Sequence, residues 1–287
     1  MPCDSPYYVF PYKGATEKIA VPCGKCPPCK HRRVNHWVFR LLQEDKVSQW
    51  SHFVTLTYDT QHVPITKNGY MSLRKKDFQD YMKRLRKAVS KRFPDAPPIR
   101  YYVAGEYGTK NKRPHYHAIV FNVPDAEMFF QSWSIGGTPI GSVHVGHVSG
   151  DSIAYTMKYI DKSSFSPGHS RDDRAKEFAL MSKGLGKAYL TPDVVAYHRQ
   201  SQVLYVTRLS GHRVSMPRYY RNKIWSEQER RQQVGTIVAN IAVQDARRRH
   251  EHVSRYGDSF DYYFRLDSEK IARHEKFYSS HQQNRSL

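Results

Sequence analysis

The order of predicted strands and helices between residues 52 and 148 most limits how this chain can fold. Four short runs are rich in β-branched and aromatic residues, which predicts strands at 52–58, 99–106, 114–121 and 142–148. Segments with helical patterning at 73–93 and 125–133 follow the first and third of these strands. The resulting β-α-β-β-α-β order predicts an α+β, ferredoxin-like antiparallel sheet with helices packed against one face.

Further helices are predicted outside this pattern. Residues 31–47 carry apolar side chains on one face, and Ser72 is the predicted N-cap of the helix at 73–93. A helix is also expected to open at Ser149-Gly150-Asp151. The chain from Trp225 onward looks helical and basic, so it is either a solvated tail or a DNA contact, and residues 203–207 predict one more strand.

The charge balance points to a polyanionic partner. The 287 residues include 46 Lys and Arg against 26 Asp and Glu, a formal net charge of +20. A chain this basic favours nucleic acid as the partner and an acidic membrane second, with a surface kept basic for solubility as the alternative. No apolar run is long enough to span a bilayer, and the N-terminus lacks a secretory pattern. We therefore expect no membrane association and a cytoplasmic location.

All four cysteines lie within the first thirty residues, as Cys3 and the segment Cys23-Gly24-Lys25-Cys26-Pro27-Pro28-Cys29. The CxxCxxC spacing lets three thiolates converge, and Cys3 can complete a tetrahedral zinc site. Paired disulfides, a redox pair or free thiols are the alternatives, and the missing secretion signal weighs against disulfides. The pattern predicts a structural Zn²⁺ knuckle.

His115, His117 and Glu106 form a second candidate metal site. Alternate residues of a strand share a face, so the two imidazoles lie about 7 Å apart at Cα and Tyr116 points away. A hairpin would bring Glu106, at the end of the preceding strand, beside them. Two histidines and one carboxylate with open positions can hold a divalent cation. A packed histidine pair and an exposed acid that pairs with Arg113 are the alternatives.

Tyr155 and Tyr159 are spaced to share one face of the predicted helix. Lys158 and Lys162 repeat at the same interval, which makes two overlapping YxxK units. A phenol has a pKa of about 10, so a nucleophilic tyrosine needs nearby positive charge or a base. The lysines and a metal would supply that charge, whereas the alternative is a helix that buries aromatic rings.

These motifs together resemble the HUH endonucleases. The resemblance rests on Phe53–Tyr58, on Gly105–Gly108 leading into Arg113–His117, and on Tyr155–Lys162. It is closer to the rolling-circle replication initiators of microviruses, the small circular single-stranded DNA phages. The gokushovirus branch is most similar, because its initiators also begin with Pro-Cys and carry a CGxCxxC segment like Pro22–Cys29. The motifs span residues 3–162, and weaker similarity continues at 181–190 and 217–220.

The resemblance implies a site-specific nickase and strand transferase that initiates rolling-circle replication. It places Mg²⁺ or Mn²⁺ on His115 and His117, with Glu106 at the position of a third ligand. It makes Tyr155 the first nucleophile, through a 5′-phosphotyrosine, and Tyr159 the second, with Lys158 and Lys162 as motif lysines. A free 3′-OH would then prime a host polymerase, and no ATP is needed.

Other basic residues are candidate DNA contacts. Arg113 precedes the histidine strand, and Lys183 and Lys187 lie in a Gly-rich turn that we expect to be flexible. The pattern GxxxxGK[ST] does not occur in the sequence, so we expect no nucleotide cofactor. The expected partners are single-stranded DNA at a replication origin and the helicase and DNA polymerase of a bacterial host.

We expect four segments: a cysteine knuckle at 1–30, an endonuclease core at 31–165, a basic loop and strand extension at 166–225, and a basic helical tail at 226–287. Two other classes of function fit parts of the sequence. A plasmid relaxase or a tyrosine transposase would use the same chemistry. A zinc-stabilised DNA-binding protein without enzymatic activity would explain the charge and the cysteines, but not the histidine and tyrosine motifs.

Overall fold

The computed structural model describes residues 3–108, 110–148, 153, 169–208, 211–257 and 259–283. The chain forms two compact units. One takes Trp37–Tyr189, and the other combines the residues up to His36 with those from Leu190 onward. Helix α1 (Pro27–Asp45) begins in the second unit and ends in the first.

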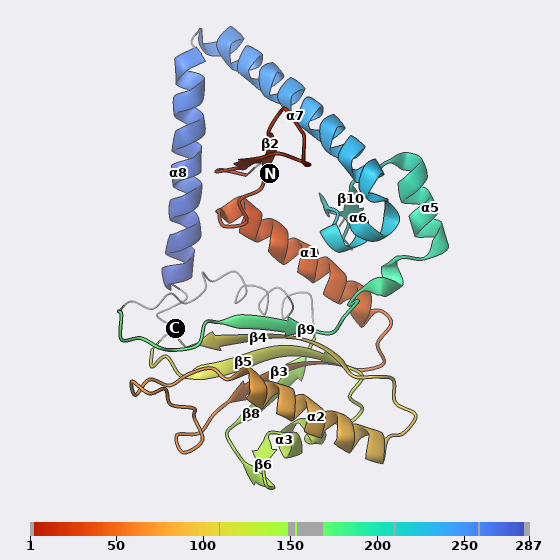
Figure 1. Ribbon diagram of the computed structural model, residues 1–287, viewed down its shortest axis with the longest axis vertical. Coiled ribbons are helices and arrows are strands. Elements are labelled where there is room, and N and C mark those ends of the chain that lie inside the picture. Colours follow the sequence, from red (N-terminus) through yellow and green to blue (C-terminus); the bar gives the residue numbers. More distant parts are fainter. Residues whose placement is uncertain are drawn as a thin grey trace. The chain divides into compact units, whose positions relative to one another are not determined.

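The Trp37–Tyr189 unit contains a five-stranded sheet (Figure 1) in which every neighbouring pair of strands is antiparallel. The strand order is β8-β3-β5-β4-β9. The strands are β3 (Ser51–Thr57), β4 (Arg100–Tyr107), β5 (Pro114–Phe121), β8 (Val143–His147) and β9 (Phe178–Met181). The first four are the predicted strands, each within one residue of its expected ends. The α+β class with an antiparallel sheet is confirmed.

One face of the sheet carries the main hydrophobic core. Because strand side chains alternate, Val54 and Leu56 point to this face from β3, and Tyr116 and Ala118 do so from β5. Helix α2 (Lys75–Arg92) covers the face with an apolar stripe of Phe78, Tyr81, Met82, Leu85 and Val89. Helix α3 (Glu127–Ser132) packs beside it (Figure 1). These two helices confirm the predicted helical segments.

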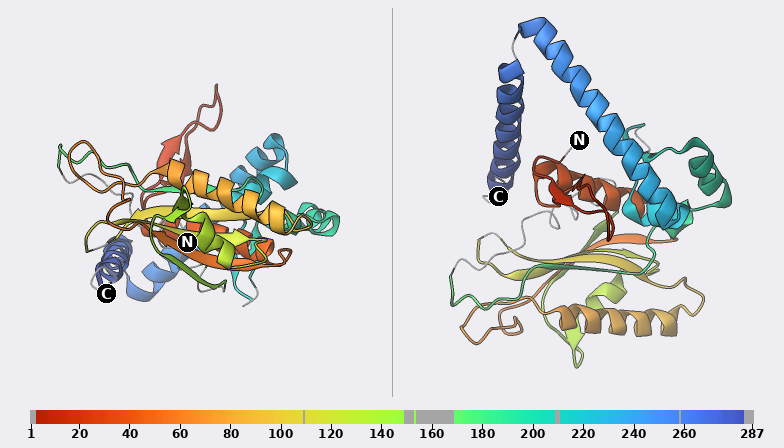
Figure 2. Two further views of the ribbon diagram at one scale, coloured as in Figure 1. Left: turned by 90° about the horizontal axis from the view of Figure 1, so that it is seen from below. Right: turned by 45° about the horizontal axis from the view of Figure 1, so that its top comes forward.

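The opposite face of the sheet is also covered, by the half of α1 that begins at Trp37 (Figure 2). The Trp37 ring meets the Tyr102 ring of β4 edge-on, with 4.7 Å between centroids. Farther along α1, the buried Glu44 carboxylate forms an ion pair with Arg100. The sheet therefore carries helices on both faces rather than on one, because α1 folds back over β4.

The start of α2 differs from the predicted capping. Its N-cap is Arg74, whose side chain makes no capping hydrogen bond. Ser72 is instead buried, and its Oγ accepts a hydrogen bond from the Ala175 N–H at 3.0 Å. Inside the first turn, Arg74 Nε donates to Asp77 Oδ1 at 2.7 Å. The prediction of a Ser72 cap was wrong because the Ser72 side chain instead binds the backbone of the segment that leads into β9.

The sequence pattern did not predict most of the shorter elements. In the sheet unit these are β6 (Ser134–Ile135), β7 (Thr138–Pro139), β9 and the 3₁₀ turn η1 (Lys187–Tyr189). In the other unit they are β1 (Tyr7–Val9), β2 (Ile19–Val21), α5 (Pro192–Ser201), β11 (Arg213–Ser215) and α6 (Arg218–Ile224). The predicted strand at 203–207 is present as β10 (Tyr205–Thr207), which pairs with β11.

The tail forms two long helices, α7 (Glu227–Tyr256) and α8 (Ser259–Gln283), as the sequence predicted. Ser226 and Glu229 make a capping box at the start of α7, which satisfies backbone donors there. Gly257 ends α7 with a φ of 76°. In the described part of the chain, no helix combines the length and the apolar character that crossing a bilayer would require.

Candidate active site and candidate metal centre

The β4–β5 hairpin brings the three predicted metal ligands to one face of the sheet. Glu106 pairs directly with His115, and His117 pairs with Ala104 on one side and Thr55 on the other. The ligands lie opposite the core face that Tyr116 enters. The strand register therefore places two imidazoles and one carboxylate where a single ion can reach them.

The side chains of this site are in contact. The Nε2 of His117 lies 3.1 Å from Glu106 Oε1, and these residues are only 8% and 4% exposed. The His115 ring is half-buried, with its centroid 5.9 Å from that of His117. Gly108 packs against the His115 ring so closely that a Cβ there would lie 2.9 Å from its Nε2. A side chain at position 108 would therefore displace the His115 ring from its present place.

Thr55 is a site residue that the motif analysis missed. Its Oγ1 lies 3.0 Å from Nδ1 of His117. Because a carboxylate only accepts, the Nε2–H of His117 donates to Glu106, and Nδ1 then accepts from the Thr55 hydroxyl. A cation at Nε2 requires the other tautomer, in which Nδ1–H donates to Thr55. A hydroxyl suits both states, so Thr55 can fix the ring for metal binding.

The donor set fits a divalent cation. Carboxylate oxygen suits Mg²⁺ and Mn²⁺, and imidazole broadens the choice toward later transition metals. Among the described residues, the four cysteines are the only group whose ligand atoms all lie within 4.8 Å of one another. The ligand atoms of His115, His117 and Glu106 are spread more widely. A cation here would replace the contact between His117 and Glu106 and leave positions open for substrate oxygen.

The predicted nucleophiles Tyr155 and Tyr159, with Lys158 and Lys162, lie outside the described residues. Within this segment only Ile153 is described, and it is helical and fully buried. The assignment of these four residues stays a prediction from the sequence.

Arg113 is placed to shape the site's surroundings. Its guanidinium donates to the Tyr58 carbonyl at 3.0 Å and to Thr60 Oγ1 at 3.1 Å. It therefore ties the end of β3 to the entry of β5. The alternative of an ion pair with Glu106 does not occur among the described contacts.

Lys183 and Lys187 are both exposed, so their ammonium groups can reach a polyanion. The turn that carries them is anchored, in contrast to the loose turn expected from its glycines. Leu185 is fully buried, its carbonyl accepts from Arg40, and the Gly186 N–H donates to Glu44 at 2.7 Å. A fixed backbone would present the two lysines in a constant geometry.

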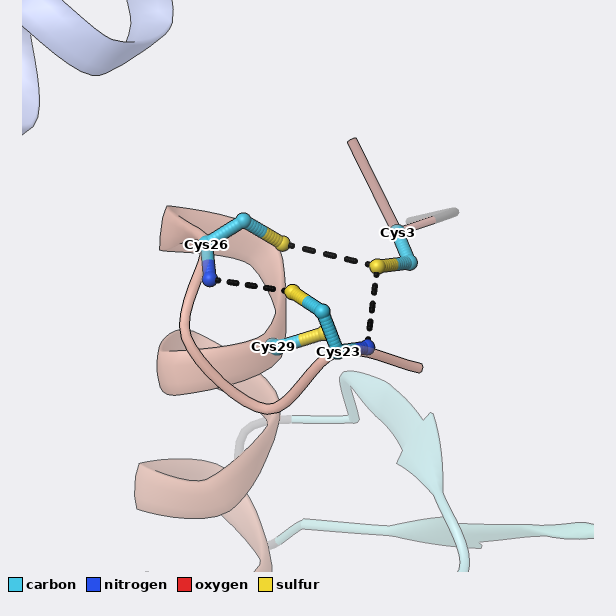
Figure 3. Close-up of side chains that lie close together, drawn as sticks. All are labelled: Cys3, Cys23, Cys26 and Cys29. Carbon is cyan, nitrogen blue, oxygen red and sulfur yellow. Dashed lines mark hydrogen bonds between the residues drawn. The ribbon is translucent and has the colours of Figure 1, made fainter. Parts of the chain in front are cut away.

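The four cysteines form a compact cluster (Figure 3). All four thiol sulfurs lie within 4.8 Å of one another, and no disulfide joins them. The Sγ atoms of Cys3 and Cys26 are 3.7 Å apart. Tetrahedral zinc with Zn–S bonds of about 2.3 Å requires sulfur separations near 3.8 Å. The geometry therefore fits one tetrahedral metal ion.

Local backbone positions the cysteine thiols. The N–H groups of Cys26 and Lys25 donate to Cys23 Sγ at 3.3 and 3.4 Å. Although burial opposes it, these bonds lower the pKa of the Cys23 thiol to about 6. Burial raises the pKa of the Cys29 thiol to about 12. A cation would favour the thiolate form at all four positions.

The cysteine cluster is connected to helix α8. The carboxylate of Asp4, next to Cys3, lies 3.1 Å from Nε2 of His274 and 3.8 Å from Arg273. Lys30, one residue after Cys29, lies over the Phe277 ring at 5.2 Å. The cluster thus joins the N-terminal segment, α1 and α8 within one unit.

Comparisons with known proteins relate this chain to replication-associated proteins of small phages. Residues 51–164 match the family model of the replication-associated protein ORF2/G2P. The chain is 29% identical over 226 residues to the replication-associated protein VP4 of Bdellovibrio phage phiMH2K, covering 71% of this chain and 67% of that protein. It is 28% identical over 221 residues to the replication-associated protein ORF2 of Spiroplasma virus 4, covering 72% and 68%. A third relative, the replication-associated protein ORF4 of Chlamydia phage 1, is 26% identical over 223 residues, covering 70% and 53%. No solved structure gives a significant match.

Proposed function

Because residues 51–164 belong to the replication-associated protein ORF2/G2P family and the chain is related to the replication-associated proteins of small phages, we propose that it initiates rolling-circle replication. In this proposal it is a site-specific endonuclease and strand transferase acting on single-stranded DNA. The observation that carries the proposal is the meeting of Glu106, His115 and His117 on the sheet face opposite the core.

The three residues would hold one divalent cation, Mg²⁺ or Mn²⁺, which when bound polarises the scissile phosphate and offsets charge on its oxygens. Thr55 would hold the His117 ring in the required tautomer. Tyr155 Oη attacks phosphorus, and the bond from phosphorus to the 3′ oxygen breaks. The phenolic proton is lost, and the departing oxygen gains one to become a 3′-OH.

Lys158 would favour ionisation of the phenol through its positive charge. The phosphodiester energy is kept in the 5′-phosphotyrosine, so the step needs no nucleotide cofactor. After one round Tyr159, supported by Lys162, would cut the regenerated origin. The released 3′-OH then attacks the first phosphotyrosine and closes a circle, which restores the Tyr155 phenol.

The strand order supports this proposal at the level of the fold. The predicted β-α-β-β-α-β pattern corresponds to strands β3, β4, β5 and β8 in chain order. In the sheet, β3 lies between β8 and β5, and β5 lies between β3 and β4, as a split βαβ arrangement requires. The ligands then come from the central strand β5 and its neighbour β4, which hold side chains more rigidly than loops do. The remaining expected partners are a host DNA polymerase and helicase in the bacterial cytoplasm.

We propose that the cysteine cluster binds a structural Zn²⁺. Four protein thiolates would fill a tetrahedral shell and leave no position for substrate, as in other structural zinc sites. Arg113, Lys183 and Lys187 are proposed DNA contacts, with Arg113 also stabilising the hairpin entry.

The test is cleavage of labelled single-stranded DNA that carries the origin of the chain's own replicon, with Mn²⁺ present. We expect a nick and a peptide–nucleotide adduct that mass spectrometry maps to Tyr155. Tyr155→Phe should abolish that adduct and leave DNA binding within a few-fold. Absence of both nick and adduct with the origin present would overturn the proposed chemistry.

A further inference from the structure

The elbow between α7 and α8 gathers arginines and aromatic rings. We define the elbow by Arg248, Arg249, Arg255 and Tyr256 of α7 and by Tyr262, Tyr263, Phe264 and Arg265 of α8. Several of these residues line an open hollow. The elbow belongs to the unit that contains the cysteines, whereas the sheet site belongs to the other unit.

The arginines of the elbow are available for anions. Among the described residues, none of Arg248, Arg249, Arg255 and Arg265 forms an ion pair with a carboxylate. The acidic neighbours have other partners: Asp245 accepts from the Tyr262 hydroxyl, and Asp261 lies 3.2 Å from His252 Nε2. Two further carboxylates, Glu251 and Glu269, line the hollow beside Arg248, Arg255 and Arg265, so the arginines exceed the carboxylates of the lining by one.

The aromatic rings of the elbow face solvent. Tyr256, Tyr263 and Phe264 are 54%, 51% and 65% exposed. Single exposed rings are common on protein surfaces, but a group of neighbouring exposed rings often marks an interaction site. Their neighbourhood is charged, because the Arg265 guanidinium lies 5.4 Å from the Tyr256 ring centroid and Arg249 donates to the Tyr263 hydroxyl at 3.4 Å.

The elbow is held in a fixed geometry. Tyr262 is buried, and its ring lies 5.4 Å from that of His252, which in turn lies 4.8 Å from Tyr256. This aromatic packing locks the end of α7 against the start of α8. The exposed rings and guanidinium groups are therefore presented together rather than on a loose tail.

We propose that this elbow is a second binding site, for single-stranded DNA without sequence preference. Guanidinium groups suit phosphates, and exposed rings provide a stacking platform for bases. Bases in a duplex already stack on one another, so the rings favour an unpaired strand. The choice of DNA over RNA rests on the proposed function, in which a strand is cut and must be retained. Tethering at the elbow would raise the local concentration of that strand at the sheet site.

The aromatic half of the elbow is tested on the full chain. Affinity for labelled oligodeoxythymidine, which carries no origin, is measured by fluorescence anisotropy with chelator present to prevent cleavage. Tyr256→Ala/Tyr263→Ala/Phe264→Ala should raise the Kd about tenfold or more. The matched control is Val238→Ala/Ile241→Ala/Val243→Ala, which removes exposed apolar side chains from α7 and should leave the Kd unchanged.

The basic half is tested by salt dependence. Arg248→Gln/Arg255→Gln/Arg265→Gln should make the slope of log affinity against log salt shallower by about 0.7 for each lost phosphate contact. The aromatic variant should instead keep the wild-type slope and lose affinity for the single strand more than for a duplex. Unchanged slope and unchanged Kd in both variants would overturn the proposal.

Two further measurements keep the test decisive. If the aromatic variant loses helical circular dichroism, it cannot be used, and the wild-type chain is instead crosslinked to 5-iodouracil DNA. Crosslinks that map outside the elbow peptides overturn the proposal. Tighter binding of oligouridine RNA than of DNA overturns the DNA assignment. His117→Gln should abolish nicking while oligodeoxythymidine still binds, so failure of the nickase proposal is distinguishable from failure of the elbow site.

Discussion

The two candidate metal centres differ in their donor atoms and in whether those donors fill the coordination shell of the metal. The sheet site offers two imidazoles and one carboxylate from adjacent strands, whereas the cysteine cluster offers four thiols from the N-terminal segment, the turn before α1 and the first turn of α1. Three ligands leave room for substrate and four do not. Ligand count, more than burial, therefore separates a centre suited to chemistry from one suited to holding a fold.

The largest expected effect is on catalysis at the sheet site. Glu106→Gln keeps the size of this buried side chain but removes its charge, so we expect metal-dependent cleavage to fall by at least about a hundredfold. Thermal melting should change little. Nicking at the wild-type rate in this variant would show that Glu106 is not a metal ligand. It would also contradict the contrast drawn between the sheet site and the cysteine cluster.

The next effect is on stability at the cysteine cluster. Cys26→Ser removes a buried ligand, so we expect bound zinc to be lost and melting to fall by several degrees or more, because metal-binding free energy contributes to folding. Elemental analysis and calorimetry would measure both. Cys26→Ser protein with wild-type melting and full zinc content would contradict the structural assignment.

A smaller effect is expected at Thr55. Thr55→Val keeps the shape but removes the hydroxyl that contacts His117 Nδ1, so Mn²⁺ affinity measured by titration calorimetry should fall about 10–100-fold. Thr55→Ser restores the hydroxyl and should recover most of the affinity. Equal affinities in all three proteins would show that Thr55 does not orient the ring.

The smallest effect is expected at Tyr116, which lies between the two histidines but faces the core. Its hydroxyl donates to the Arg74 carbonyl at 3.0 Å and lies 2.7 Å from the Tyr58 hydroxyl. Tyr116→Phe should lower the free energy of unfolding by about 1–3 kcal/mol and leave cleavage unchanged. Denaturant unfolding and the nicking assay measure the two quantities. A Tyr116→Phe protein that keeps its stability but loses cleavage would contradict the expectation that one sheet face supports folding and the other catalysis.

Local sequence predicted those features whose partners are close along the chain. Glu106 and His115 meet across one hairpin turn, and the spacing of Cys23, Cys26 and Cys29 brings their thiols together over a single turn and the start of α1. The four strands could be predicted because their alternation is strong. Two-residue periodicity also placed Tyr116 on the opposite face from the histidines.

Long-range contacts were beyond sequence patterns. Thr55 meets His117 only through the pairing of β3 with β5, and Gly186 meets Glu44 across 142 positions. The contact of Asp4 with His274 spans 270 positions. Short elements such as β9 also escaped prediction, because its four residues gain strand character by pairing with β4.

The most direct test removes metal from one centre and not from the other. The chain is treated with a mild chelator, and zinc content, melting temperature and nicking of origin DNA are then measured on the same sample. The account predicts that nicking disappears and returns with Mn²⁺, while about one zinc per chain and the melting temperature persist. Nicking that survives chelation, or that is lost only together with zinc and the fold, would contradict the division into an open catalytic centre and a closed structural one.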